Sequence, residues 1–270
     1  HTRYPLVTGV QTCALPISPQ YALDVAGFIN TDKYSGYKQD GNTVLYASTT
    51  NSTLAIGAPS AAAWMSATST SFISIAIGSN ALGATPQNGT ATVNVAIGTN
   101  SLAANTAGQG NTAVGVTSLY NNTTGSNNVA VGFQTIWRNT TGSGNVGIGE
   151  NVMGRNTTGS NNIALGISAL GSNTAATSSV AVGVNAGSGS TLYANQGGVY
   201  IGYQSGKSVN TGSDYNTLVG YQAGYGITTG SNNIWIGTAT SSTGIANLTT
   251  GSQNILVGNN ISLPSATGNG

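Results

Sequence analysis

The sequence predicts an all-β chain folded as a parallel β-solenoid of about twelve coils, each 17–21 residues long. The first observation is a recurrent step from an aliphatic residue to glycine, spaced by 17 residues from Gly98 to Gly183. The second is a pair of mainly β-branched residues before each glycine, and the third is a recurrent Asn-Thr-Thr-Gly-Ser segment. Such a period indicates stacked units that cannot bury their apolar side chains alone. The structural repeat glycines are Gly57, Gly78, Gly98, Gly115, Gly132, Gly149, Gly166, Gly183, Gly202, Gly220, Gly237 and Gly258.

The N-terminal residues 1–18 resemble a translated sequencing-library adapter, whose bases encode Val7 to Ile17 in this frame. The rival interpretation is a secretory signal, but the segment has no apolar run of the length that a signal needs. We therefore exclude residues 1–18 from the fold prediction and expect the natural N-terminus to be missing. The remaining chain divides into a β-rich lead-in segment (19–52), the repeats (53–262) and a truncated tail (263–270).

The composition excludes several classes of partner. Without residues 1–18 the chain has no cysteine and no histidine, and five basic residues balance five acidic ones. Nucleic-acid binding needs clustered Lys and Arg, and binding to an anionic membrane surface needs a polybasic segment. No apolar stretch approaches the length of a membrane span. The sequence therefore predicts no nucleic-acid partner and no direct membrane insertion.

Each repeat begins with a short strand, which we count from its glycine as position 0. Positions −3 and −1 are mainly β-branched, and a spacing of two puts both on one side of a strand. Position −2 is mainly alanine and faces the other way, as at Ala76, Ala113 and Ala181. A strand with one large apolar side and one small side predicts burial on both sides, with the small side against something very close.

The remainder of each repeat should close the coil. After the glycine we expect a second short strand, whose position +4 fills the interior with residues such as Leu102 and Leu119. The Asn-Thr-Thr-Gly-Ser segment supplies the return turn, because Gly and Asn tolerate positive φ. Twelve stacked coils would span roughly 55–60 Å at about 4.8 Å each. So small a coil has a thin core, so we expect three chains around a common axis, with the alanine row as their contact surface.

The strand segments resemble a known family. The segments Ser74–Gly78, Asn94–Gly98 and Asn162–Gly166 are similar to the head repeat of YadA-like trimeric autotransporter adhesins, over about residues 51–260. The resemblance implies a homotrimeric, left-handed parallel β-roll on a bacterial cell surface. It also implies a non-enzymatic function, adhesion to a host protein or glycan receptor.

Two departures from that family leave an alternative open. The family's head repeat is nearer fourteen residues, and its stalk and membrane anchor do not follow here. The longer repeat, and a lead-in over Tyr21–Asn30, resemble phage tail-fibre-like proteins that carry a C-terminal self-cleaving chaperone. The alternative is therefore a shaft segment of a virion tail fibre.

Catalytic, cofactor and metal sites are not expected. A hexapeptide-repeat acyltransferase needs an aliphatic residue every six positions and a general base, and the trimmed chain lacks histidine. Asp24, Asp32 and Asp40 precede the repeats and are interpreted as solvated turn residues. Metal-binding solenoids use Asp in each turn, whereas these turns use Asn, Thr and Ser. The Gly147-Ile148-Gly149 segment lacks the strand-to-helix context of a phosphate-binding loop.

Aromatic residues provide the only hint of a ligand site. Tyr200 and Trp235 replace alanine at position −2, and we interpret them as filling a wider trimer interface rather than as a sugar-binding surface. Trp137, beside Arg138, is the best candidate for an exposed anchor. The last third of the chain also clusters Tyr203, Tyr221 and Tyr225.

The asparagines and threonines of the return turn allow two further interpretations, as glycosylation sites and as an ice-binding surface. The glycosylation sequons at Asn139 and Asn156 are part of the recurrent Asn-Thr-Thr-Gly-Ser turn, so we interpret them as structural residues and not as glycosylation sites. An ice-binding function would need a flat Thr-x-Thr strand face, which the repeats lack, so we expect no thermal hysteresis.

Overall fold

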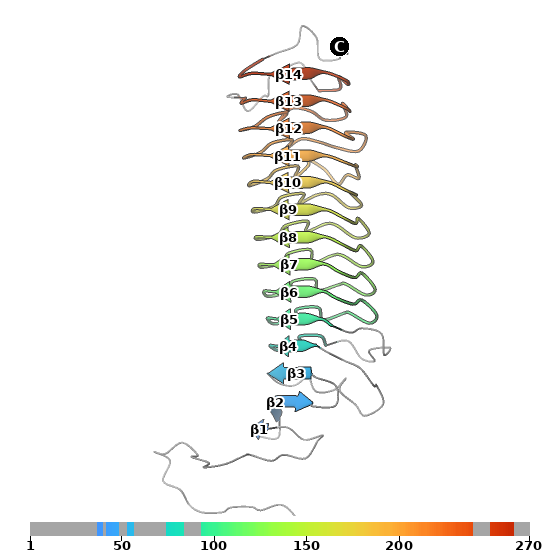
Figure 1. The fold of residues 1–270 in the computed structure, drawn as a ribbon, viewed down its shortest axis with the longest axis vertical. Coiled ribbons are helices and arrows are strands. Elements are labelled where there is room, and N and C mark those ends of the chain that lie inside the picture. The colour runs from blue at the N-terminus through green and yellow to red at the C-terminus, as the bar shows by residue number, and fades with distance from the viewer. Residues whose placement is uncertain are drawn as a thin grey trace, which may run out of the picture.

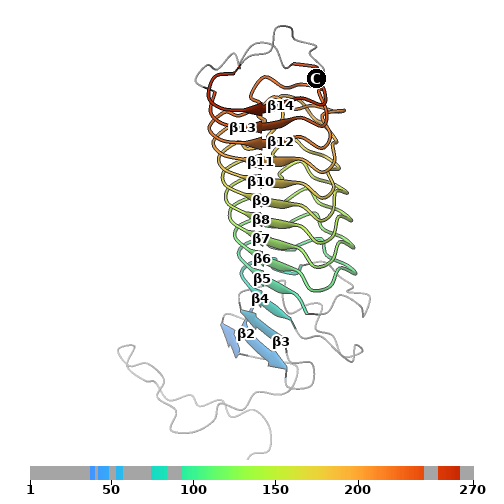
Figure 2. The ribbon, with the colours of Figure 1, turned by 45° about the horizontal axis from the view of Figure 1, so that its top comes forward.

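The chain winds into a column of stacked coils (Figures 1 and 2). The computed structural model describes residues 37–39, 42–48, 53–56, 74–83, 93–239 and 249–261, so residues 1–18, Gly57 and the three early aspartates lie outside the described residues. Its 14 strands form one sheet in chain order. The strands are β1 (Tyr37–Gln39), β2 (Asn42–Ser48), β3 (Thr53–Ile56), β4 (Ile75–Ile77), β5 (Val95–Ile97), β6 (Thr112–Val114), β7 (Val129–Val131), β8 (Val146–Ile148), β9 (Ile163–Leu165), β10 (Val180–Val182), β11 (Val199–Ile201), β12 (Thr217–Val219), β13 (Ile234–Ile236) and β14 (Ile255–Val257).

The predicted parallel β-solenoid is confirmed. Strands β1 and β2 pair antiparallel with their neighbours, whereas the twelve strands from β3 to β14 pair in parallel and form one wall of about ten turns. The register keeps every repeat position in line, as when Ala113 pairs with Ala130. Each position of the repeat therefore forms a row of side chains running up the column.

The expected sides of the strand are reversed in the structure. Position −2 points into the coil and is fully buried, with Ala113, Ala130 and Ala164 each 0% exposed. Positions −3 and −1 point outward, and Ile163 retains 43% of its exposure. The alanine row is therefore not a contact surface between chains. The reason is steric: position +4 already fills the coil from the opposite wall, so only a small residue fits across from it.

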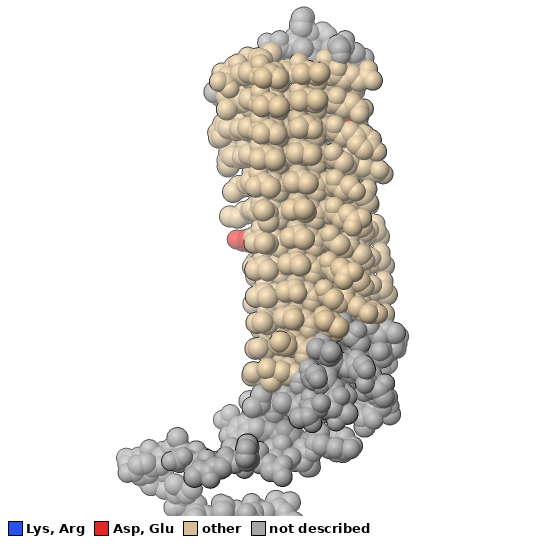
Figure 3. Space-filling view, in the orientation of Figure 1, with Lys and Arg blue, Asp and Glu red and all other residues tan. Residues whose placement is uncertain are grey.

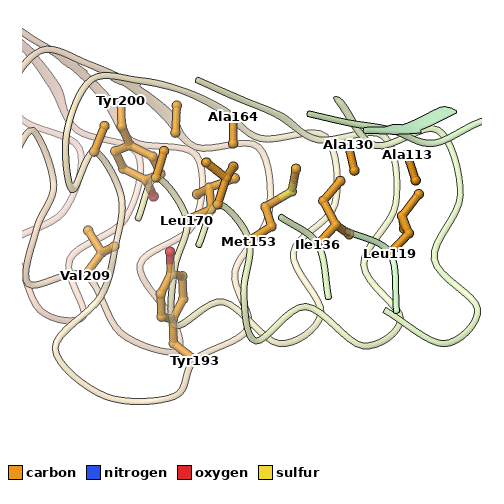
Figure 4. Close-up of a cluster of buried hydrophobic side chains, with 14 of the residues drawn as sticks. Ala113, Leu119, Ala130, Ile136, Met153, Ala164, Leu170, Tyr193, Tyr200 and Val209 are labelled. Atoms are coloured by element: carbon orange, nitrogen blue, oxygen red, sulfur yellow. The ribbon is translucent and has the colours of Figure 1, made fainter. Parts of the chain in front are cut away.

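The interior packing behind this reversal is visible in Figure 4, where the alanines point toward a line of larger side chains. As predicted, position +4 closes the interior, and its members are 0–1% exposed. They are Leu82, Leu102, Leu119, Ile136, Met153 and Leu170. The two walls of the coil are thus held together by one row of small residues facing one row of large residues.

The expected second strand is absent from the described coils. Residues after the glycine form turns with positive φ at positions +2 and +4, such as Thr117 (54°) and Leu119 (49°), which is not extended backbone. This segment still bonds to both neighbouring coils. The Thr117 amide donates to Thr99 O (2.9 Å) and the Leu119 amide donates to Thr135 O (3.0 Å). The alternation between negative and positive φ therefore bends the backbone after the glycine, while its amides and carbonyls still form hydrogen bonds with the neighbouring coils.

The later coils use the reverse arrangement of sizes. Position −2 becomes Tyr200, Leu218 and Trp235, and all three are buried at 0–2% exposure. Position +4 becomes glycine in the same region, where a Cβ on Gly206 would lie 2.5 Å from the Tyr200 ring. Tyr200 and Trp235 therefore fill the coil interior, and the prediction that they fill a trimer interface is wrong.

Two ladders of buried asparagine line the return turn. In the first, Asn122 Nδ2 donates to Asn105 Oδ1 (2.9 Å) and to the carbonyl of Gly125 (2.9 Å). In the second, Asn128 Nδ2 donates to Asn111 Oδ1 (3.1 Å), and the Asn128 backbone amide donates to the same oxygen (3.0 Å). Buried amides need such partners, so the polar interior is stable only when the coils stack in register.

Candidate interaction surface

The strand wall presents an apolar surface to the outside. We call the outward side chains of positions −3 and −1 the strand face. At the C-terminal end of the described column Ile255 is 74% exposed and Val257 is 66% exposed. The exposed large members of the strand face are Ile56, Ile75, Ile148, Ile163, Ile201, Ile234, Ile236, Ile255 and Val257. Between them lie half-buried valine, isoleucine, leucine and threonine side chains.

A third row follows the glycine corner and widens the strand face; it is apolar or aromatic in the middle coils and polar toward both ends of the column. Position +1 carries exposed residues in successive coils, and Glu150 is the charged member of this row. The exposed apolar members are Val116, Phe133, Ile167, Val184, Tyr203 and Tyr221. The Tyr203 and Tyr221 rings stack with their centroids 5.3 Å apart. The face visible in Figure 3 carries almost no charged side chains.

The size of this surface matches the largest apolar patch that a typical soluble monomer exposes, which is often a functional one. Eleven strands from β4 to β14 at about 4.8 Å spacing, with outward rows spanning about 10 Å or more, give on the order of 500 Å². A soluble monomer rarely exposes a contiguous apolar patch beyond a few hundred Å², and larger patches mark interaction sites. The strand face is therefore the first candidate for an interface.

The structure places Trp137 on the opposite wall, where its side chain is partly exposed. The Arg138 guanidinium carbon lies 4.5 Å from the centroid of the Trp137 ring, in a cation–π contact. Tyr120 occupies the equivalent position of the preceding coil and is 36% exposed. The anchor predicted from the sequence is thus accessible, and it lies in a small aromatic and cationic group.

The other residues considered from the sequence belong to the scaffold. Asn139 and Asn156 of the sequons are 0% and 1% exposed, so their side chains serve the buried ladder, as expected. Gly147 lies in β8 and Gly149 forms a coil corner with φ of 131°. Tyr225 is half-buried beneath the Lys207 ammonium, 5.4 Å from its ring centroid.

Two further kinds of feature are absent from the described residues. They contain no group of three or more His, Cys, Asp or Glu residues placed to hold a metal ion. They also contain no helix long and apolar enough to cross a membrane.

Burial changes the acidity of two tyrosines, Tyr193 in the irregular coil between β10 and β11 and Tyr200 within β11 itself. Desolvation raises the pKa of the Tyr193 phenol well above its ordinary value, and it raises the pKa of Tyr200 in the same way. Tyr193 donates a hydrogen bond to Gly187 O, and Asn195 Nδ2 donates to Tyr200 Oη (3.2 Å). Both phenols therefore remain neutral and structural.

Comparison of this chain with protein-family models, with curated proteins and with solved structures finds no match. The surface of the column and the repeat itself are therefore the features that point to a function.

Proposed function

We propose that the chain is a non-enzymatic module of a homotrimeric surface fibre, in which three left-handed β-rolls pack their strand faces around a common axis. The observation that carries the proposal is the strand face, a continuous and uncharged, mainly apolar surface along β4–β14. From the sequence, the alanine row was the expected contact surface of the trimer. The proposed contact surface is instead the outward rows of isoleucine and valine at positions −3 and −1.

The energetics favour association. Apolar burial contributes roughly 25 cal/mol per Å², so covering a surface of several hundred Å² per chain offsets the cost of association. A standard interface buries about 800 Å² per partner, and the strand face together with the +1 row approaches that area as a total over both neighbours. The near absence of charge on this surface removes the desolvation cost that charged side chains would add.

The proposed role of the fibre is adhesion to a host protein or glycan receptor at a bacterial cell surface. A stack of coils whose registered hydrogen bonds run along its whole length suits a stiff, exposed spacer. Ligand contacts would then lie on the walls left free by the strand face. The resemblance of the strand segments to adhesin head repeats supports the same role.

A shaft segment of a phage tail fibre is the second candidate. The observation that favours it is the 17-residue coil, in which the longer return turn is stabilised by its own asparagine ladder. Both candidates need the same trimer, and they differ in whether the column itself attaches to a surface.

The adhesive role can be tested with beads coated with the full chain. We expect the beads to stay attached under flow to cultured epithelial cells, and beads coated with heat-unfolded chain to be washed away. If the folded trimer gives no more attachment than the unfolded control, adhesion is excluded and the shaft interpretation replaces it.

A further inference from the structure

Two arginines lie on the wall opposite the strand face, and no acidic residue of the described coils pairs with either of them. From residue 53 to residue 261 the chain carries five charged residues, namely Arg138, Glu150, Arg155, Lys207 and Asp214. Arg138 and Arg155 are separated by 17 residues and occupy position +6 of adjacent coils. Both side chains are exposed, and neither forms an ion pair with an acidic residue of the described coils.

The register of the stack places these two arginine residues at neighbouring positions of adjacent coils. The residues that follow them, Asn139 and Asn156, are joined by an Nδ2 to Oδ1 hydrogen bond of 3.0 Å. One residue further along, the Thr140 amide donates to Thr157 O (2.8 Å). The two arginine backbones are therefore about 5 Å apart, the spacing of neighbouring coils. An anion bound within reach of both guanidinium groups would offset the repulsion between two cations on neighbouring coils.

Arg138 is held in place by the Trp137 ring. Its guanidinium carbon lies over the ring, 4.5 Å from the centroid, in a cation–π contact that needs no N–H donor. The in-plane N–H donors remain free for a carboxylate or a sulfate, which the planar guanidinium binds through two parallel hydrogen bonds. The tryptophan therefore orients a donor that would otherwise swing freely.

Packing on an aromatic ring does not account for Arg155. In its coil the position of Trp137 is taken by Gly154, so no ring lies at the matching place. On the other side of Trp137 the stack adds a second ring, because the Asn121 amide donates to Trp137 O (3.0 Å) and Tyr120 precedes Asn121. The result is a patch of two partly exposed rings bordered by two free guanidinium groups.

We propose that Tyr120, Trp137, Arg138 and Arg155 form a binding site for an acidic carbohydrate, a sugar that carries a carboxylate or a sulfate. The apolar face of a pyranose ring stacks on the tyrosine and tryptophan rings, and the arginine pair takes its anionic group. Two cations on a chain of near-zero net charge are too few for a nucleic acid or an anionic membrane. The inference rests on the proposed adhesive function and names the ligand class of that function.

The site stays accessible in the proposed trimer. Positions −2 and +4 meet inside the coil, so the strand and the segment after the glycine are opposite walls. The strand face turns toward the neighbouring chains, and positions +5 and +6 turn away from them. A ligand on this wall therefore does not compete with assembly.

The test is titration of the full chain with four probes while the fluorescence of its tryptophans is followed. The probes are tetragalacturonic acid, a chondroitin sulfate tetrasaccharide, neutral maltotetraose and sodium sulfate. We expect one or both acidic tetrasaccharides to change the fluorescence of the partly exposed Trp137, and maltotetraose and sodium sulfate to bind at least tenfold more weakly. Equal binding of maltotetraose or sodium sulfate, or no binding of either acidic probe, would overturn the inference.

Variants locate the site. Arg155→Ala should weaken binding at least tenfold with an unchanged melting temperature, and Arg155→Lys should recover only part of the affinity because lysine cannot bind an oxyanion bidentately. The matched control is Lys207→Ala, which removes the cation of another cation–π pair among the described residues. If Lys207→Ala weakens binding as much as Arg155→Ala, the site is not at this patch. A trimer that attaches to cells and ignores both acidic probes would refute this inference alone.

Discussion

At the scale of single residues, the corner glycine is required for two independent reasons. Its φ lies between 115° and 150° from Gly78 to Gly258, a region that side chains with a Cβ rarely adopt. Its hydrogen also faces the next coil, because a Cβ on Gly132 would lie 2.2 Å from the carbonyl oxygen of Gly149. The glycine row therefore sets how closely successive coils can approach.

Gly132→Ala should destabilise the column more than backbone strain alone can explain. The matched control is Gly212→Ala, since Gly212 also has positive φ (91°) but a Cβ there would contact nothing within 4 Å. We expect the control to cost about 1–3 kcal/mol and Gly132→Ala to cost clearly more. Urea unfolding of both variants measures the difference, and equal midpoints would contradict the role given to coil contact.

The buried asparagine is the second residue on which the stack depends. Asn128 accepts a hydrogen bond from the Asn145 amide (3.0 Å) and donates to Gly142 O (2.9 Å). Each buried group left without a partner costs about 1–3 kcal/mol. Asn128→Ala should therefore lower the free energy of unfolding by about 3 kcal/mol or more. Thr124→Ala at an exposed turn is the control, and a similar loss in both would refute the ladder's contribution.

At the scale of the element, each coil is closed by a pair of facing positions whose sizes are complementary. Position +4 has φ near 50° even where it is leucine, as at Leu102 and Leu119, so the backbone does not demand glycine there. Glycine appears at Gly187, Gly206 and Gly224 because the facing side chain is large. The fold therefore requires a suitable combined side-chain volume at positions −2 and +4, and not a particular residue at either position.

This complementarity predicts non-additive stability. Tyr200→Ala should cost about 3–5 kcal/mol, because the coil cannot collapse around the cavity. Adding Gly206→Leu, which is strongly destabilising alone, should restore part of this loss by returning the coil to the pattern of the earlier repeats. A double-mutant cycle on unfolding free energies measures the coupling, and simple additivity would contradict it.

The buried tyrosines of the same region predict a pH dependence. Folding raises the pKa of Tyr193 and Tyr200 above the ordinary value of 10.0, so below pH 10 both states keep the proton and the stability is unaffected. Above pH 10 the unfolded chain releases the proton first, and stability falls by up to about 1.4 kcal/mol per pH unit for each tyrosine. Urea midpoints at pH 9, 10 and 11 measure this fall. Tyr193→Phe with Tyr200→Phe should flatten it, and an unchanged slope in that variant would contradict the assignment.

The coil also shows how far the sequence alone could predict the structure. Period, parallel stacking, corner glycines and the inward leucines of position +4 follow from the repeat, because each depends on spacing. Which side of the strand faces the interior does not follow from the repeat, because alternating residues define two sides and do not determine which of them is buried. Hydrophobicity favours burying the β-branched rows, yet the coil has room only for Ala113 and its equivalents. One signal in the sequence could have shown which side is buried: position −2 becomes large at Tyr200 in the same coil in which position +4 becomes glycine at Gly206.

The candidate site was only partly predictable for a similar reason. Trp137 and Arg138 stand out as an aromatic and a charge in an uncharged repeat, and the structure confirms that they are accessible. The contribution of Arg155 depends on register between coils, which becomes definite only when the ladder hydrogen bonds are known.

At the scale of the whole molecule, the column has one apolar wall and one polar wall. The strand face should govern assembly, so Ile163→Asp with Ile201→Asp should weaken self-association at least a hundredfold, because charges would enter an apolar interface. Thr141→Asp with Thr158→Asp, at exposed turn positions, is the matched control and should leave association unchanged. Sedimentation velocity across a dilution series compares the two pairs. Equal behaviour would place the interface elsewhere.

The central claim is that the strand face joins three chains, and the absolute mass of the full chain in solution tests it most directly. Sedimentation equilibrium should give three times the chain mass of 26.8 kDa, with a circular dichroism spectrum rich in β-structure. A folded particle of a single chain mass would show that the column tolerates its exposed apolar wall without a partner. That result would contradict the trimeric fibre and the function proposed from it.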